Sequence, residues 1–432
     1  MKKQLAVVSI LTVASQLAAL FKLWFTARIF GIGSELDGYN LSIVLPTLIV
    51  GVMAGVLQTG LFPVRAKLNA DGDEVATASF ERSVLLGIAV LGCIFTLLLL
   101  LGAPFIVDRL SQSAPESVRT SLAFAFPVIV LLVALNFVGD CCGYLLAMRN
   151  RFAIAAAAPV ANGLLGAFML AVWPEGGLTN LVAGTVLGVA LQVSICLWGL
   201  KSTGFVFIGP LPTWVTTKGH WGEMLSLGGW ILPGVIFSNL VVSLPPVWAA
   251  QYGEGAVSAF GYAYRLHSSA LQLLVIASST VILAQFSNLV AQGDVAAVRR
   301  ILAKAGAVSA IVGLFGVLAV WAVGAVLLHW LFGGRFDNDA AERVSSHWLL
   351  LTLGLPFAIL GNVFAKLWQA QKRPQLISIM AAISLMSLTV MHSIADLFLK
   401  EYSLPAALAT SATSVVLVGI WFLNPMKKKL PV

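Results

Sequence analysis

The sequence predicts an all-α polytopic membrane protein of about 12 transmembrane helices in two six-helix lobes. Hydrophobic residues make up 59% of the 432 residues and charged residues only 10%, against about 25% charged residues in a typical soluble domain. The apolar residues fall into runs of roughly 20, the length that crosses a hydrocarbon core of about 30 Å. The two halves of the chain also resemble each other. This composition excludes a soluble globular protein, a disordered chain and a nucleic-acid-binding protein.

Apolar runs between charged or turn-rich breaks define the predicted spans. The first run follows Met1-Lys2-Lys3 and continues to about Phe25, which favours an uncleaved span over a signal peptide. The twelve spans cover residues 5–27, 40–64, 83–107, 121–146, 152–173, 178–200, 224–249, 257–283, 303–332, 345–370, 375–398 and 404–424.

The positions of lysine and arginine predict the orientation in the membrane. With the N-terminus in the cytoplasm, 17 of the 26 cations fall in cytoplasmic segments, 6 fall outside and 3 lie within spans. An excess of Lys and Arg on the cytoplasmic side is typical of membrane proteins. We therefore expect a multi-pass protein of the bacterial inner membrane with both termini in the cytoplasm.

An internal repeat predicts the two lobes. Residues 27–73 and 250–294 share a Gly-containing turn, a Gly-Tyr pair and an Ala-x-Gly-Asp-like turn, at an offset of about 222 residues. Six spans per copy predict parallel repeats about a pseudo-two-fold axis along the membrane normal, with a central cleft that opens to either side. The predicted domains are an N-lobe at 1–200, a cytoplasmic linker at 201–222 and a C-lobe at 223–432.

Few ionisable residues lie within the spans. Each costs roughly 2.5–3.5 kcal/mol on insertion scales, so such residues usually face a bundle interior or a water-filled cavity. Lys22 and Arg265 are both predicted in the outer half of the membrane, one in each lobe. Together with Arg28 they would line the cleft and attract an anionic head group, and Asp37 could pair with Arg28 or Lys22. The alternative is that Lys22 snorkels to the interface and Arg265 forms a structural pair.

Three further polar residues are possible coupling or structural residues. Asp140 would either pair with Arg149 or another loop cation, or belong to a coupling-ion site. Asn40 and Asn162 would hydrogen-bond between helices or contact sugar hydroxyls. The cysteines and histidines show no metal-ligand spacing, so neither a metal nor a cofactor is predicted.

Several motifs resemble the MviN/MurJ family. Ala27-Arg28-Ile29-Phe30-Gly31-x-Gly33-x-x-x-Asp37, followed by Leu45-Pro46, resembles its N-terminal signature, and Tyr262-Ala263-Tyr264-Arg265-Leu266 resembles its eighth-span region. Leu146 to Ile154, followed by Ala158-Pro159-Val160-x-Asn162, resembles its connection between spans 4 and 5. This resemblance covers essentially the whole chain and points to the multidrug/oligosaccharidyl-lipid/polysaccharide exporter superfamily.

The resemblance implies alternating access and flipping of a polyprenyl-pyrophosphate-linked glycan, typically lipid II. It also implies that cavity cations hold the pyrophosphate: Lys22 and Arg265 occupy two such positions, and Asp37 matches the family's acid at the start of span 2. Other positions depart from the family. The expected first-span arginine is Gln16, an expected Asn and paired arginines are Thr47, Val50 and Gly51, an expected acid is Gly55, and the lipid II flippases typically carry two more spans.

These observations favour a transporter, not an enzyme. Its partners would be a lipid-linked anionic glycan and membrane lipids, and we expect a monomer coupled to the membrane potential or to an ion of unspecified identity. A flippase for exopolysaccharide or O-antigen repeat units is one alternative, and a multidrug-type cation exporter is another. A membrane-embedded glycan polymerase or glycosyltransferase has a single candidate motif, Asp337-Asn338-Asp339, in a short outside turn.

Overall fold

The computed structural model describes residues 2–207 and 214–423, and helices make up most of these ranges, with no strand in them. By internal packing the chain divides into two compact units, Met1–Val235 (unit 1) and Ile236–Val432 (unit 2). The division falls within one long helix, which begins inside the range predicted as a linker.

Unit 1 contains eight helices and the first part of a ninth. Their bounds are α1 Lys2–Phe30, α2 Ser34–Ala70, α3 Glu74–Leu101, α4 Ala103–Leu110, α5 Glu116–Ile129, α6 Leu131–Met148, α7 Phe152–Val172, α8 Gly177–Lys201 and α9 Trp214–Ala249, with a 3₁₀ turn η1 at Pro174–Gly176.

Unit 2 contains the end of α9 and six further helices. Their bounds are α10 Ala256–Ala291, α11 Val295–Phe332, α12 Asn338–Leu353, α13 Leu355–Ala370, α14 Pro374–Leu399 and α15 Ser403–Leu423, with 3₁₀ turns η2 at Ala250–Tyr252 and η3 at Lys400–Tyr402.

The helices match the predicted spans. In the described residues, nine helical segments are long and apolar enough to cross a membrane, or ten if α12 and α13 count as one bent span. One of these segments, Pro374–Leu423, holds both α14 and α15, which pack against each other. Within the described residues each of the twelve predicted ranges is occupied by helix, with α3 and α4 sharing 83–107, α5 and α6 sharing 121–146, and α12 and α13 sharing 345–370. The protein is therefore a multi-pass helical membrane protein.

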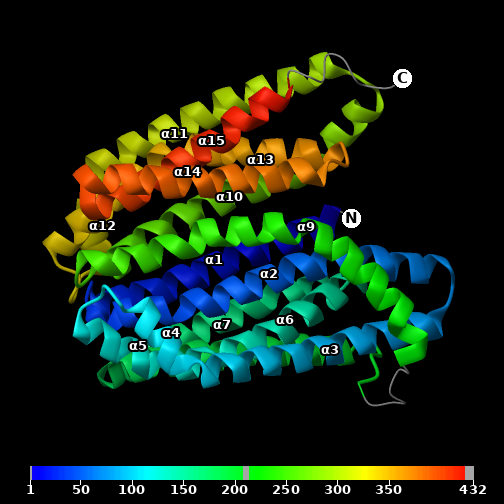
Figure 1. The fold of residues 1–432 in the computed structure, drawn as a ribbon, viewed down its shortest axis with the longest axis horizontal. Coiled ribbons are helices and arrows are strands. Elements are labelled where there is room, and N and C mark those ends of the chain that lie inside the picture. Colours follow the sequence, from blue (N-terminus) through cyan, green and yellow to red (C-terminus); the bar gives the residue numbers. More distant parts are fainter. Residues whose placement is uncertain (1, 208–213, 424–432) are drawn as a thin grey trace. The chain divides into compact units, whose positions relative to one another are not determined.

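Both units repeat one packing order, which supports the internal repeat. In unit 1, α2 packs on α5 and α6, just as α10 packs on α12 and α13 in unit 2. The helix α3 packs on α6 as α11 packs on α13. Likewise α7 packs on α8 in unit 1, as α14 packs on α15 in unit 2, and the latter pair can be followed in Figure 1. The broken helices also correspond, since Pro127 lies just before the α5–α6 break and Pro356 just after the α12–α13 break.

Turns at corresponding positions have the same geometry. The carboxylates of Asp73 and Asp294 each accept a hydrogen bond of 2.8 Å from the backbone N–H three residues on, and so cap α3 and α11. After α6 and α13, Asn150 and Lys372 both adopt positive φ, at 60° and 55°. A residue in this left-handed conformation ends a helix, and the last carbonyl groups of the helix still accept hydrogen bonds from the backbone. These matched caps define the residue-by-residue equivalence of the two units.

Glycines allow close packing of α9 on α2 in unit 1. A Cβ atom on Gly60 would lie 2.4 Å from the carbonyl oxygen of Met224, and one on Gly55 would lie 2.7 Å from Val235. A Cβ on Gly228 would likewise lie 2.8 Å from Val56. Small residues at helix interfaces let backbones approach closely in membrane proteins. The first part of α9 is therefore an integral part of unit 1.

Candidate functional site

The clearest candidate site in unit 1 is built around Lys22 of α1. The aliphatic stem of Lys22 crosses α7 at Gly166, where a Cβ atom would lie 2.9 Å from the lysine Cδ. Its Nζ then donates a 2.8 Å hydrogen bond to the hydroxyl of Thr185 on α8. The absence of a side chain at Gly166 thus gives the ammonium room to reach across α7.

Thr185 connects Lys22 to a third helix. Its hydroxyl donates to the carbonyl oxygen of Leu181 at 2.7 Å, so it acts as an acceptor toward its other partners. Those partners are Lys22 Nζ and the hydroxyl of Tyr39 on α2, the latter at 2.7 Å. Tyr39 and Thr185 are both buried. We call Lys22, Tyr39 and Thr185 the lysine cluster.

The charge of Lys22 has only a neutral partner. Within the described residues no ion pair involves Lys22, and its one hydrogen bond goes to the Thr185 hydroxyl. Lys22 is therefore not paired with Asp37 in this part of the chain. An ammonium has three donor hydrogens, so a half-buried one bonded to a single hydroxyl retains capacity for an anion.

The other predicted N-lobe residues lie near the turn between α1 and α2. Arg28 is exposed, with its guanidinium 5.5 Å from the ring centroid of Trp24, in the last turn of α1 where a cation is favourable. Asp37 is fully buried in the first turn of α2, where an anion is favourable, and Asn40 lies half-buried one turn later.

Arg265 belongs to unit 2 and lies on α10. It is half-buried and follows the buried residues Tyr262 and Ala263. Its carbonyl oxygen accepts a 3.1 Å hydrogen bond from the Ser268 hydroxyl. Because Lys22 and Arg265 belong to separate units, the shared cleft between them stays a prediction.

The possible coupling residues have different surroundings. Asn162 on α7 donates a 3.1 Å hydrogen bond to Gln192 on α8, and a Cβ on Gly188 would lie 2.5 Å from the Asn162 amide oxygen. Asn162 thus links two helices. Asp140 is half-buried on α6, and among the described residues it forms no ion pair.

The expected pair between Asp140 and Arg149 is wrong, because Arg149 pairs with Glu81 of α3 instead. Glu81 is fully buried, and its other carboxylate oxygen accepts a 3.0 Å hydrogen bond from Arg65 Nε of α2. Arg149 also donates to the Thr203 hydroxyl at 3.2 Å and lies 5.2 Å from the ring centroid of Phe205. Glu81 therefore joins α2, α3 and the end of α6 to the segment after α8.

Sequence reasoning missed Glu81 and the role of Thr185. The signal for Glu81 was present, because it is an acid immediately before a predicted apolar span, with cations at the ends of neighbouring helices. Nothing in the sequence distinguishes Thr185 from other membrane-span threonines, most of which bond their own helix. The candidate enzyme motif also has a structural role, since the Asp337 carboxylate caps α12 by accepting from the Ala340 N–H at 2.8 Å.

Two adjoining, partly open pockets lie in unit 2. The larger has a volume of about 260 Å³ between α9, α13, α14 and α15, with Ser238, Asn362 and Ser384 among mostly apolar lining residues. The second, of about 170 Å³, reaches Tyr264 and the buried His267 of α10. No cluster of His, Cys, Asp or Glu suited to a metal ion occurs in the described residues.

Comparisons with known proteins agree with this architecture. A family model described as "Lipid II flippase MurJ" matches residues 26–431. The probable lipid II flippase MurJ of Rhizobium meliloti (strain 1021) is 25% identical over 416 residues, which are 91% of this chain and 76% of that protein.

Solved structures show the same fold at low sequence identity. A lipid II flippase MurJ in an inward closed conformation matches with a TM-score of 0.84 at 17% identity, over 97% of this chain and 87% of that one. An inward-facing multidrug resistance MATE family transporter of the MOP superfamily matches with a TM-score of 0.81 at 14% identity, over 98% of this chain and 100% of that one.

Proposed function

The chain belongs to the lipid II flippase MurJ family, and we propose that it moves a polyprenyl-pyrophosphate-linked saccharide across the bacterial inner membrane by alternating access. Membership of this family makes the protein a transporter rather than an enzyme. The head group would bind in a polar site while the prenyl chain stays in lipid, and no covalent step is needed.

The observation that supports this proposal is the ammonium of Lys22. It is held among apolar helices by a single hydroxyl, and no carboxylate in the described residues neutralises it. A cation in such a place is costly unless it pairs, and a diphosphate is a strong partner for an ammonium. Lys22 and Arg265 would contact the diphosphate, with Arg28 and Asp37 at the outer rim.

We further propose lipid II or a related glycan precursor as the substrate. Two departures from the family pattern keep exopolysaccharide and O-antigen repeat units as the main alternative. Gly55 stands where the family carries an acid, and its contact with Val235 leaves no room for one. Thr47 stands where an Asn is expected, and its hydroxyl donates to its own helix, to Ile43 at 2.8 Å and Val44 at 3.0 Å.

The test is flipping in proteoliposomes, measured by chemical quenching of a fluorescent lipid on one leaflet. Wild-type protein should flip fluorescent lipid II or another undecaprenyl-diphosphate saccharide, and comparing the two identifies the glycan. Lys22→Gln should slow flipping about tenfold, the effect of losing one charged hydrogen bond. The matched control is Lys366→Gln, because Lys366 is also a half-buried lysine within a span but bonds only Gln369 of its own helix, at 3.2 Å. Flipping by Lys22→Gln at the wild-type rate would contradict the proposal.

Cation export is the second candidate function, because the fold matches that of a multidrug resistance MATE family transporter. A lipophilic cation such as tetraphenylphosphonium, loaded into the same proteoliposomes, tests it directly. We expect no export of this cation, because the unneutralised charge of the lysine cluster is positive. Cation export without lipid flipping would replace the first proposal with the second.

We also propose a membrane topology and an energy source. Both termini would lie in the cytoplasm and the protein would act as a monomer. The membrane potential supplies about 2.3 kcal/mol per charge per 100 mV, which would drive an anionic head group outward without a dedicated ion site. Asp140 is the candidate if an ion or proton is coupled, since it is a half-buried carboxyl with no ion pair among the described residues.

A further inference from the structure

Two exposed cations at the start of α11 have no anionic partner in the part of the chain that is described. Arg300 and Lys304 lie one turn apart, so their side chains are neighbours on the helix surface. Like charges at this spacing repel each other. The residues three and four positions to either side are Ala, Ile, Val or the two cations themselves, and the nearby carboxylate of Asp294 is already bonded to the Ala297 N–H.

The same face of α11 continues as an exposed apolar stripe. Val308, Ile311 and Phe315 are 51%, 56% and 67% exposed. At about 100° per residue they fall within roughly 80° of Arg300 around the helix, as does Lys304. From Lys304 to Phe315 the helix rises about 16 Å, close to half of a hydrocarbon core of about 30 Å. Cations at one end and a one-leaflet apolar stripe below them match the shape of a phospholipid.

The repeat shows that the fold does not require these cations. Counting from the matched caps Asp73 and Asp294, the residues of α3 equivalent to Arg300 and Lys304 are Ser79 and Ser83. Ser83 accepts a 3.1 Å hydrogen bond from the Trp221 indole, which belongs to unit 1 itself. The cation pair is therefore a property of unit 2 alone.

We propose that Arg300 and Lys304 bind the phosphate of an anionic phospholipid such as phosphatidylglycerol, with its acyl chain along Val308, Ile311 and Phe315. The charge of the pair requires an anion, and the stripe below it requires hydrocarbon, so one molecule that carries both satisfies the whole face. A free phosphate would satisfy only the cations. This lipid site is separate from the lysine cluster and does not depend on which saccharide is transported.

The experiment uses the full chain purified from nanodiscs that contain phosphatidylcholine and phosphatidylglycerol, with native mass spectrometry to count the lipids that stay bound. Wild-type protein should retain phosphatidylglycerol in preference to phosphatidylcholine. Arg300→Gln with Lys304→Gln should lower that retention roughly tenfold, the order expected when two cations beside an anionic lipid are neutralised. The charge-preserving exchange Arg300→Lys with Lys304→Arg should keep it.

The matched control removes two other exposed cations, by Lys372→Gln with Arg373→Gln. These residues precede α14, and one and two turns beyond Arg373 the residues Ile377 and Met380 are half-buried and buried, so no exposed apolar stripe continues directly from Arg373. This control should change lipid retention less than twofold. Equal losses in both double variants would reduce the effect to net charge and overturn the proposal. Displacement of the lipid by millimolar inorganic phosphate would assign the cations to a free anion instead.

Discussion

Glu81 and Leu302 occupy equivalent places in the two units, eight residues after the caps Asp73 and Asp294, and both are buried. Glu81 pairs with Arg65 and Arg149, whereas Leu302 belongs to an apolar core with Phe286 and Trp368. By the same count Arg65 corresponds to Phe286. Counting from the left-handed residues Asn150 and Lys372, Arg149 corresponds to Gln371. At equivalent positions, unit 1 is therefore packed by buried ion pairs and unit 2 by apolar side chains.

Replacing Glu81 alone should be strongly destabilising. Glu81→Gln leaves two largely buried guanidinium groups without their anion, and losing one partner of a buried ion pair costs about 3–5 kcal/mol. We expect a marked fall in the midpoint of thermal unfolding in detergent. An unchanged midpoint would contradict the stabilising role of Glu81 in this cluster.

Copying the apolar solution should restore much of that loss. The triple variant Arg65→Phe, Glu81→Leu and Arg149→Gln places the unit 2 residues at the equivalent positions of unit 1. Buried ion pairs are often no more stable than well-packed apolar residues of similar volume. The triple variant should therefore unfold at a higher temperature than Glu81→Gln, and an equal or lower midpoint would show that unit 1 cannot repack there.

Thr185→Val should weaken transport through Lys22. The substitution keeps the side-chain volume but removes the oxygen that accepts from Lys22 Nζ and Tyr39. A hydrogen bond to a charged group contributes about 1.5–3 kcal/mol, so we expect flipping to fall about tenfold in proteoliposomes. Thr389→Val is the control, because the exposed Thr389 hydroxyl bonds only its own helix at Leu385. A similar rate for both variants would remove Thr185 from the site.

Gly60→Ala should destabilise unit 1 by about 1–3 kcal/mol, the usual cost of overpacking. The new Cβ would meet the Met224 carbonyl oxygen at 2.4 Å, and a backbone atom cannot move aside cheaply. Gly143→Ala on α6 meets nothing within 4 Å and should stabilise the helix slightly. Thermal unfolding of the two variants compares them, and shifts in the same direction would contradict the packing of α9 on α2.

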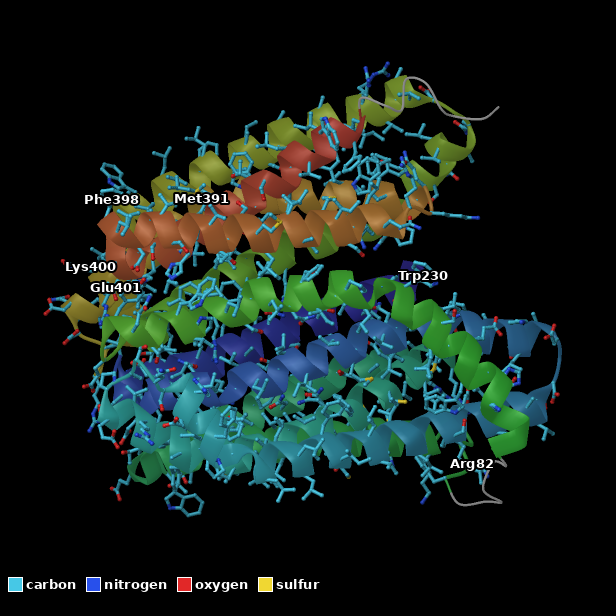
Figure 2. All side chains as sticks on the ribbon, viewed as in Figure 1. Arg82, Trp230, Met391, Phe398, Lys400 and Glu401 are labelled. Carbon is cyan, nitrogen blue, oxygen red and sulfur yellow. The ribbon has the colours of Figure 1, made fainter. Side chains whose placement is uncertain are left out.

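Glu401→Gln should lower stability by about 2 kcal/mol, because Glu401 accepts two or more hydrogen bonds from the Arg343 guanidinium, one of them at 3.0 Å from Nε. Arg343 also donates to the Glu254 carbonyl at 3.1 Å, so the pair joins three segments of unit 2. Lys400→Gln is the neighbouring control. Lys400 and Glu401 lie next to each other just after α14, close to Phe398 (Figure 2). Equal unfolding midpoints for the two variants would make this ion pair energetically unimportant.

Helix positions follow from the sequence because the bilayer sets their length. The twelve apolar runs all became helices, and the matched prolines and turns predicted the repeat. The start of α9 at Trp214 was not predicted, since its first part is held to unit 1 by contacts such as Gly60 with Met224, between residues far apart in the chain.

Side-chain partners were less predictable for the same reason. Asp140 was expected to pair with Arg149, but both are on or next to α6, and the packing of α3 on α6 brings Glu81 closer. Lys22 was identified from its cost in a membrane span alone. Its partner Thr185 is 163 residues away and could be found only from the packing of α1, α7 and α8.

The bend of 43° between α12 and α13 depends on Gly354, where a Cβ atom would lie 2.7 Å from the Cα of Ala409 on α15. At that point two main chains touch with a single hydrogen atom between them. Any larger side chain would act as a wedge and push α15 off the elbow. The close approach therefore ties α15 to the bend, so a change in the angle between α12 and α13 would also have to displace α15.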